Sequence, residues 1–233
     1  MDAGEFRRQI TAAYRILNER LGLVRTVSSL HSLKVDSAFN EVALIPESTY
    51  QQIYLTALSR SYYNLLLSDY SLLQFSWSAE DAWRLAYLPN PWLAGVPEAE
   101  ERVREWEALE GLGRYDDTEI GLLLSELPYY GSIPPLRFEY AVSQYKELAH
   151  PAAHLHIGRH TDNRWPVAKA LGPISFALII VKMYYGEPWA KHSLYYEGAA
   201  PCIDAELISA LEGSRRIHAF SDTEARSLHL NAR

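Results

Sequence analysis

Apolar and polar residues alternate along the chain in a way that predicts a helical start, a strand-rich middle and a helical end. Between residues 1 and 22, apolar side chains recur every three or four positions, which predicts an amphipathic helix that ends at Gly22. Its apolar positions are Phe6, Ile10, Ala13, Tyr14, Leu17 and Leu21. Residues 24–46 are less regular, and Val35, Phe39, Val42 and Leu44 suggest short extended segments there.

A second helix and a group of strands are predicted downstream. Ser48 and Gln51 fit a capping box, so we expect a helix to begin there. Apolar segments 62–67, 70–77 and 83–88 follow, separated by short polar turns, and they predict a three-stranded antiparallel meander. Helices are then expected over residues 97–110 and from Asp117 or Thr118 to Leu124.

The later part of the chain predicts a hairpin followed by helices. Residues 136–145 and 152–159 alternate between apolar and polar side chains, as half-buried strands do. An almost wholly apolar helix is expected over 174–185, ended by Gly186, with shorter helices over 203–211 and from Thr223. The predicted fold class is therefore α+β. We expect a single domain over residues 1–233, with a mainly antiparallel sheet (the three-strand meander plus the later hairpin) packed by several helices. Within it, residues 1–22 are expected to form an N-terminal helix and residues 193–233 a helical C-terminal extension.

Composition narrows the class of protein. With 233 residues and 48% hydrophobic content, the chain can bury a substantial core. Its single cysteine, Cys202, excludes an internal disulfide framework and fits a reducing compartment. The N-terminus lacks the apolar stretch of a secretory signal, and Lys182 interrupts the longest apolar run, which is shorter than the ~20 residues needed to cross a bilayer. We therefore expect a cytoplasmic protein without membrane attachment.

The net charge of −7 argues against nonspecific binding of nucleic acid, but the charge is unevenly distributed. Residues 133–192 contain seven Lys or Arg against four acidic residues, an excess of +3, which leaves −10 for the rest of the chain. Five of the eight histidines also fall in this positive segment. An anionic ligand is therefore expected here first.

The segment from His150 to His160 is the most unusual in chemical terms. Because successive strand residues point to opposite faces, His154 and His156 emerge on the same side of their strand. If the two predicted strands pair as a hairpin, the polar face of the first strand brings Arg137 and Glu139 alongside them.

Three interpretations of this cluster stay open. In a metal-free acid–base site, His154 and His156 exchange protons with a phosphate ester, beside the carboxylate of Glu139. Arg137, Arg159, Arg164 and His160 are then the candidate ligand-binding residues. In a metal site, the two histidines and either Glu139 or Asp162 hold iron, manganese or zinc. In a structural interpretation, the imidazoles cover a sheet face and bond to their neighbours.

Two motifs resemble a known family. The segment Ser68-Asp69-Tyr70-Ser71-Leu72-Leu73-Gln74-Phe75 and the motif His150-Pro151-Ala152-Ala153-His154-Leu155-His156-Ile157-Gly158 are similar to those of an uncharacterised bacterial domain of unknown function, over roughly residues 50–190. The resemblance implies a prokaryotic cytosolic protein from a mobile-element or phage-defence (antiviral) part of the genome. It carries over no catalytic residue.

We therefore expect a protein that acts on a phosphate-bearing ligand, nucleic acid or nucleotide, through the His-x-His site. As an enzyme it would be a phosphodiesterase or nuclease-like hydrolase, with no cofactor or with a divalent metal. The rival hypothesis is a non-catalytic subunit or adaptor that binds a protein partner or forms a homo-oligomer. Asp69 with Gln74 is a weaker candidate for a nuclease carboxylate, since an aspartate at this place is typical of a turn.

Overall fold

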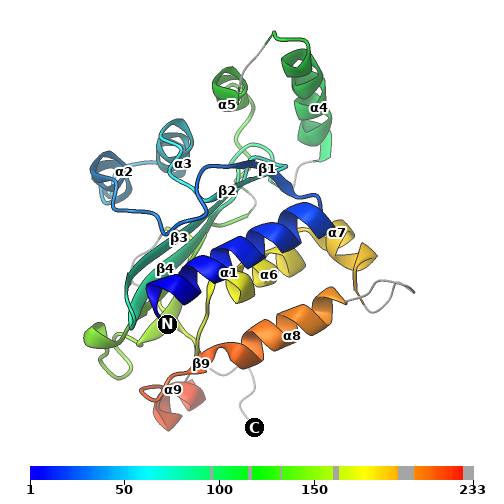
Figure 1. Ribbon diagram of the computed structural model, residues 1–233. Helices are drawn as coiled ribbons and strands as arrows, with labels where there is room; N and C mark the ends of the chain where they lie inside the picture. Colours follow the sequence, from blue (N-terminus) through cyan, green and yellow to red (C-terminus); the bar gives the residue numbers. More distant parts are fainter. Residues whose placement is uncertain (95–96, 115–116, 132, 160–162, 194–201, 228–233) are drawn as a thin grey trace.

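The computed structural model describes residues 1–94, 97–114, 117–131, 133–159, 163–193 and 202–227, and it is built around one antiparallel sheet (Figure 1). Its seven strands pair in chain order. They are β1 (Val24–Val27), β2 (Leu65–Leu67), β3 (Leu72–Ala79), β4 (Ala82–Leu88), β5 (Leu136–Ala141), β6 (Ala153–Ile157) and β7 (Trp165–Pro166). The α+β class, the meander β2–β3–β4 and the hairpin β5–β6 are confirmed.

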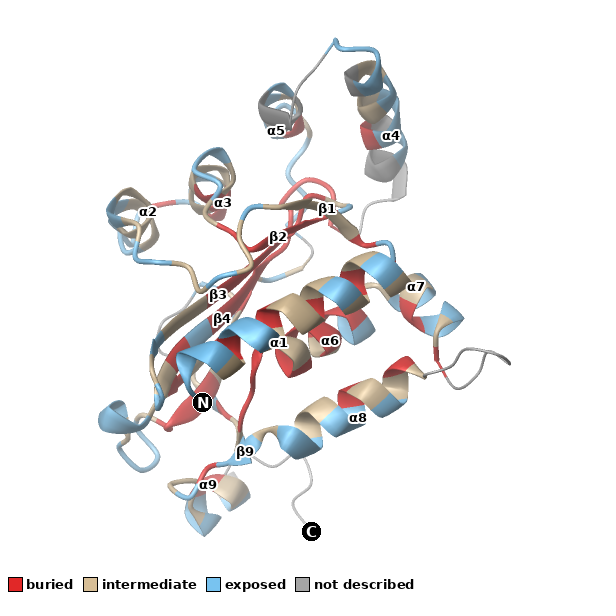
Figure 2. Cartoon of the chain, in the orientation of Figure 1, coloured by how far each residue is buried: buried red, intermediate tan, exposed pale blue. Residues whose placement is uncertain are grey.

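Strand alternation places the main core on one face of this sheet. Helices α1 (Ala3–Arg15) and α6 (Pro173–Tyr184) lie side by side against that face, and the buried residues in Figure 2 run along both. The strands contribute every second side chain to this core: Leu73 and Phe75, Trp83, Leu85 and Tyr87, Leu136, Phe138 and Tyr140. The expected first helix is confirmed, with a π-helical turn, η1 (Ile16–Arg20), before Gly22, whose positive φ of 62° ends it.

The opposite face of the sheet is apolar at one end and polar at the other. Near β2, β3 and β4 a second core packs against α3 (Tyr50–Ser59), with contributions from α4 (Pro97–Gly111) and α5 (Asp117–Ser125). Leu66, Leu72, Ala86 and Leu88 are the sheet residues of this core. On β5 and β6 the same face carries Arg137, Glu139 and the two histidines, so the candidate site lies beside this core rather than within it.

Two local expectations are corrected. Residues 37–43 are helical, not extended: Asp36 accepts a hydrogen bond from the backbone N–H of Phe39 and caps α2 (Ser37–Ala43). The capping box of α3 is formed by Thr49 and Gln52, one residue later than expected from Ser48 and Gln51.

The C-terminal elements pack on the same main core. Helix α6 ends at Tyr184, just before Gly186 as expected, and Gly186 is also the first residue of α7 (Gly186–Lys191). Helix α8 (Ile203–Gly213) adds Ile203 and Leu207 to the core, and a small second sheet pairs β8 (Lys169–Ala170) with β9 (Arg215–Arg216). Helix α9 (Asp222–Ser227) follows, and a 3-10 turn, η2 (Val142–Gln144), continues β5. No helix of the described ranges has the length and apolar character of a membrane span.

Candidate functional site

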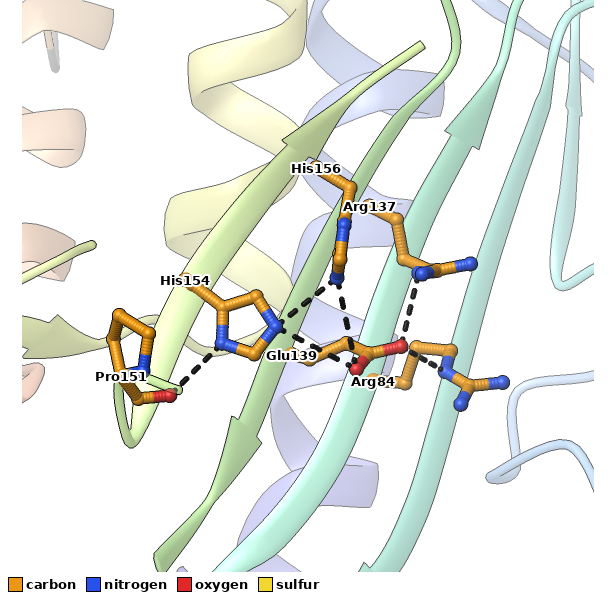
Figure 3. A network of polar contacts seen from close by, with 6 residues as sticks. All are labelled: Arg84, Arg137, Glu139, Pro151, His154 and His156. Atoms are coloured by element: carbon orange, nitrogen blue, oxygen red, sulfur yellow. Dashed lines mark hydrogen bonds and ion pairs between the residues drawn. The ribbon is translucent and has the colours of Figure 1, made fainter. Parts of the chain in front are cut away.

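The polar cluster is built by cross-strand pairing on β4, β5 and β6. Arg84 on β4 lies opposite Glu139 on β5, and Glu139 lies opposite His154 on β6. In the neighbouring row Arg137 lies opposite His156. Residues that face each other in antiparallel strands share one side of the sheet, so all five side chains project to the same face (Figure 3). The hairpin expected from the sequence thus brings Arg137 and Glu139 beside the histidines.

Three ligand-type atoms converge in this cluster. The Nε2 atoms of His154 and His156 are 3.0 Å apart. Oε2 of Glu139 is 3.7 Å from Nε2 of His154 and 3.9 Å from Nε2 of His156. The histidines are almost wholly buried, with exposed fractions of 1% and 3%. Among the described residues, this is the group of histidine, cysteine or acidic side chains whose spacing suits a metal ion.

The hydrogen bond at the other side of the His154 ring fixes its tautomer. Nδ1 of His154 lies 2.9 Å from the carbonyl oxygen of Pro151. A carbonyl oxygen only accepts, so Nδ1 carries the proton and donates it. In the neutral ring, Nε2 therefore presents a lone pair to His156 and Glu139. Such a bond from the second ring nitrogen to a backbone carbonyl is the usual support of a metal-binding histidine.

The protonation states of the cluster follow from burial and neighbouring charge. Burial is the main reason that the pKa of His154 lies below its ordinary value, so the ring is neutral at neutral pH. For Glu139, burial is again the largest effect and would raise the pKa. The positive charges of Arg84 and Arg137, together with the two histidines, outweigh it and lower the pKa of this carboxyl. The site therefore holds an ionised carboxylate beside a neutral imidazole.

The two oxygens of Glu139 face different partners. Oε1 lies 3.0 Å from Nε of Arg84 and 2.9 Å from Nε of Arg137, whereas Oε2 faces the histidines. Figure 3 shows both guanidinium groups on the side of the carboxylate away from the imidazoles. Arg84 is not among the site residues expected from the sequence. Its position between Trp83 and Leu85, both apolar, marks the polar face of the strand, but no local pattern indicates that β4 pairs with β5.

The other residues expected at the site are not all part of this cluster. Arg164 is partly buried, and its charge acts on His154 and Arg137 and lowers the pKa of both after the larger effect of burial. Arg159 is exposed beyond the end of β6. His160 and Asp162 lie outside the described residues. The His150 ring meets that of His154 edge to face, with centroids 5.0 Å apart, and it lines an open cleft of about 550 Å³ with Gln144, Lys146 and Ala149.

The separation of the three atoms matches a metal site. A point equidistant from the two Nε2 atoms and Oε2 lies about 2.1 Å from each, which is the length of zinc–nitrogen and zinc–oxygen bonds. By contrast, two imidazoles in hydrogen-bond contact do not stand on opposite sides of a phosphorus atom, as separate acid and base require. The geometry therefore favours Glu139 as third ligand and a metal-site interpretation over a metal-free one.

Asp69, the weaker candidate, takes part in a hydrogen-bond network at the turn between β2 and β3. Its carboxylate accepts bonds from the backbone N–H and hydroxyl of Ser71, at 2.9 and 3.0 Å, and from the hydroxyl of Tyr185, 3.0 Å from both oxygens. Burial raises its pKa. These bonds join the turn to the end of α6, so the described contacts of Asp69 are those of a structural residue.

Fold and site together define an α+β protein with a buried histidine–carboxylate cluster on the open end of an antiparallel sheet. Residues 23–232 match the family described as "Uncharacterized conserved protein (DUF2290)", and the chain belongs to that family. The resemblance drawn from its two motifs is thereby confirmed at the level of the family, over a longer stretch than residues 50–190. Neither a curated protein nor a solved structure matches the chain.

Proposed function

We propose that this protein binds one divalent transition-metal ion through His154, His156 and Glu139, and that it is a metal-dependent hydrolase. The observation that carries the proposal is the convergence of Nε2, Nε2 and Oε2 within bonding distance of one point. Two imidazoles and one carboxylate form the ligand set of many catalytic metal sites, in which a water molecule takes the next coordination position.

The protein's own groups are suited to these roles. The bond from Nδ1–H of His154 to Pro151 leaves the lone pair of the neutral ring on Nε2, the atom that would coordinate the ion. Arg84 and Arg137 hold Oε1 of Glu139, which leaves Oε2 to coordinate. A bound divalent ion lowers the pKa of its water ligand and so supplies a hydroxide near neutral pH. The reaction class is therefore hydrolysis.

Metal uptake tests the proposal directly. The full chain is stripped with a chelator, dialysed against Co²⁺ or Zn²⁺, and analysed for metal by mass spectrometry. We expect one ion per chain for the wild type. His154→Ala and Glu139→Gln each lower metal affinity by about 100-fold or more, because loss of a ligand exceeds the ~10–100-fold cost of losing an outer-shell partner.

The matched controls are His31→Ala and His218→Ala, which remove exposed histidines outside the cluster and leave the metal content unchanged. Circular dichroism and the melting temperature verify that each variant is folded. A folded wild type that takes up no metal, or that loses it equally on His31→Ala, would contradict the proposal. That outcome would favour the rival hypothesis of a structural cluster in an adaptor protein.

A further inference from the structure

Two arginines, Arg84 and Arg137, meet one carboxylate oxygen at the edge of the proposed metal centre. A single guanidinium group is enough to neutralise Glu139, yet both Nε atoms lie within 3.0 Å of the same Oε1. Arg164 adds a third positive charge close enough to act electrostatically on Arg137. Three arginines against one carboxylate leave the described side chains of this cluster with more positive than negative charge.

The terminal nitrogens of these arginines are placed to bind a ligand. Arg84 and Arg137 have exposed side-chain fractions of 57% and 37%, while Glu139, at 18%, is largely covered. Beyond their contacts with Glu139, neither guanidinium group makes a hydrogen bond with another described residue. Figure 3 shows the terminal nitrogens directed away from the imidazoles and away from the carboxylate that they neutralise.

From this arrangement we infer that Arg84 and Arg137 form an oxyanion subsite that holds a phosphate group of the substrate next to the metal centre. Guanidinium groups present paired N–H donors in a planar fork that matches phosphate oxygens, and such charge-assisted bonds are stronger than neutral ones. The subsite lies in the net-positive segment of an otherwise acidic chain, except for Arg84, which β4 supplies from outside it.

The inference rests on the proposed function and names its substrate class, a phosphate ester. In the hydrolysis, the oxygen of a water molecule that the ion would activate forms a bond to phosphorus, and the bond between phosphorus and the leaving oxygen breaks. The proton released from the water ends on the leaving oxygen. Arg84 and Arg137 stabilise the negative charge that develops on the non-bridging oxygens.

Phosphorus NMR of inorganic phosphate with the Co²⁺-loaded full chain tests the subsite. Paramagnetic Co²⁺ shortens the relaxation time of phosphorus only when phosphate binds close to the ion. We expect this enhancement in the wild type and, for Arg84→Gln, a phosphate affinity lower by about tenfold or more, since a bond to a charged group contributes about 1.5–3 kcal/mol. Arg84→Lys keeps the charge but not the fork, and we expect an intermediate affinity.

Arg60→Gln is the matched control. Arg60 pairs with Asp36 at exposed fractions of 44% and 18%, close to those of Arg84 and Glu139, but at the C-cap of α3 and the N-cap of α2, outside the cluster. We expect Arg60→Gln to leave the affinity for phosphate unchanged. Metal content is measured on every sample after free metal is removed, so phosphate binding is compared only between chains that hold one ion.

The outcomes separate the two proposals. If the wild type takes up no Co²⁺, the proposed function fails and the subsite fails with it. If Co²⁺ binds but Arg84→Gln and Arg60→Gln bind phosphate as the wild type does, the arginines only neutralise Glu139, and the subsite alone is overturned. Two further measurements use a nucleoside monophosphate and a single-stranded oligonucleotide as competitors of the bound phosphate. Displacement of phosphate by either one supports the inference and identifies the source of the phosphate, and displacement by neither overturns the assignment to a phosphate ester.

Discussion

At the scale of single residues, the site depends on the chemical state of His154. Its ring is buried, and its Nδ1–H is committed to the carbonyl oxygen of Pro151. Burial lowers its pKa in the folded protein, whereas the unfolded chain returns it to the ordinary value. The imidazole is therefore kept in the neutral form that a metal ion requires, and protons compete for it only in acid.

This difference in pKa predicts how the stability of the metal-free protein changes with pH. Above about pH 6.5 His154 is neutral in both states. Below it, the unfolded chain binds a proton that the folded site resists, so the free energy of unfolding falls as the pH is lowered through the folded-state pKa. The control variant is His154→Asn, which retains an N–H donor for Pro151. Urea titrations should show that the free energies of unfolding of the wild type and of this variant approach each other as the pH falls from 7 to 5. A difference in free energy of unfolding between the two proteins that is the same at every pH would contradict a lowered pKa of His154 in the folded state.

The sequence predicted the residues of the site only in part. Strand alternation was enough to place His154 and His156 on one face and to propose Arg137 and Glu139 as their neighbours, because β5 and β6 are close in the chain. Arg84 was missed because its partner strand follows only after residues 89–135, and no local pattern reports pairing over that separation. The distances from Glu139 to both histidines could not be read from the sequence, and Asp162, the other carboxylate considered, lies outside the described residues.

At the scale of secondary-structure elements, the start of α3 shows how a one-residue shift changes the role of a side chain. The hydroxyl of Thr49 accepts from the backbone N–H of Gln52, and the Gln52 side chain accepts from the N–H of Thr49. Ser48 satisfies the same sequence pattern with Gln51, so the pattern alone could not choose between the two registers.

Alanine substitutions distinguish these registers. Thr49→Ala removes the cap and should lower the free energy of unfolding by about 1 kcal/mol, whereas Ser48→Ala should change it by less than about 0.5 kcal/mol. Thermal or urea denaturation of the two variants measures the difference. A larger loss for Ser48→Ala than for Thr49→Ala would place the start of the helix one residue earlier.

The network around Asp69 joins the β2–β3 turn to the end of α6. Tyr185→Phe removes the hydroxyl that donates to Asp69 and lies 3.2 Å from the hydroxyl of Tyr87, so we expect a loss of about 1–2 kcal/mol in the free energy of unfolding. Tyr184→Phe is the control. Its ring stacks on Tyr87, and its hydroxyl makes no hydrogen bond with a described residue. Equal losses for the two substitutions would show that the hydrogen bonds of this network contribute little to the free energy of unfolding. Metal content should not change in either variant.

Across the whole molecule, the sequence pattern predicted the long apolar or amphipathic elements and missed the short ones that bury few side chains. The first helix and β5 each have one buried face, so the spacing of their apolar residues identifies them, and the meander is marked by apolar runs between polar turns. Helix α2 has no fully buried residue, and its β-branched and aromatic residues resemble an extended segment. The two-residue strands β7, β8 and β9 exist only through their pairing partners and are too short for any alternation to show.

The C-terminal helix α9 braces the loop that leads into the site. Glu224, buried to within 1%, accepts hydrogen bonds from the backbone N–H groups of Ser221 and Leu148. Leu148 has a positive φ of 61°, a conformation that is unfavourable for a branched residue and needs such support. The loop continues through His150 to Pro151, which orients His154.

Glu224→Ala should therefore lower the free energy of unfolding by about 1–3 kcal/mol, since it removes the buried carboxylate that accepts hydrogen bonds from two partly buried backbone N–H groups. Glu212→Ala, an exposed position on α8, should change it by no more than about 0.5 kcal/mol. Chemical denaturation measures both. A loss for Glu224→Ala no larger than that for Glu212→Ala would contradict the bracing role.

X-ray absorption at the zinc edge of the zinc-loaded full chain reports whether His154, His156 and Glu139 together bind one metal ion. We predict a first shell of nitrogen and oxygen at about 2.0–2.2 Å, with the outer-shell scattering of two imidazole rings. That signal should be lost in His154→Ala and retained in His31→Ala. A spectrum with oxygen ligands alone, or with imidazole scattering that survives His154→Ala unchanged, would contradict the account.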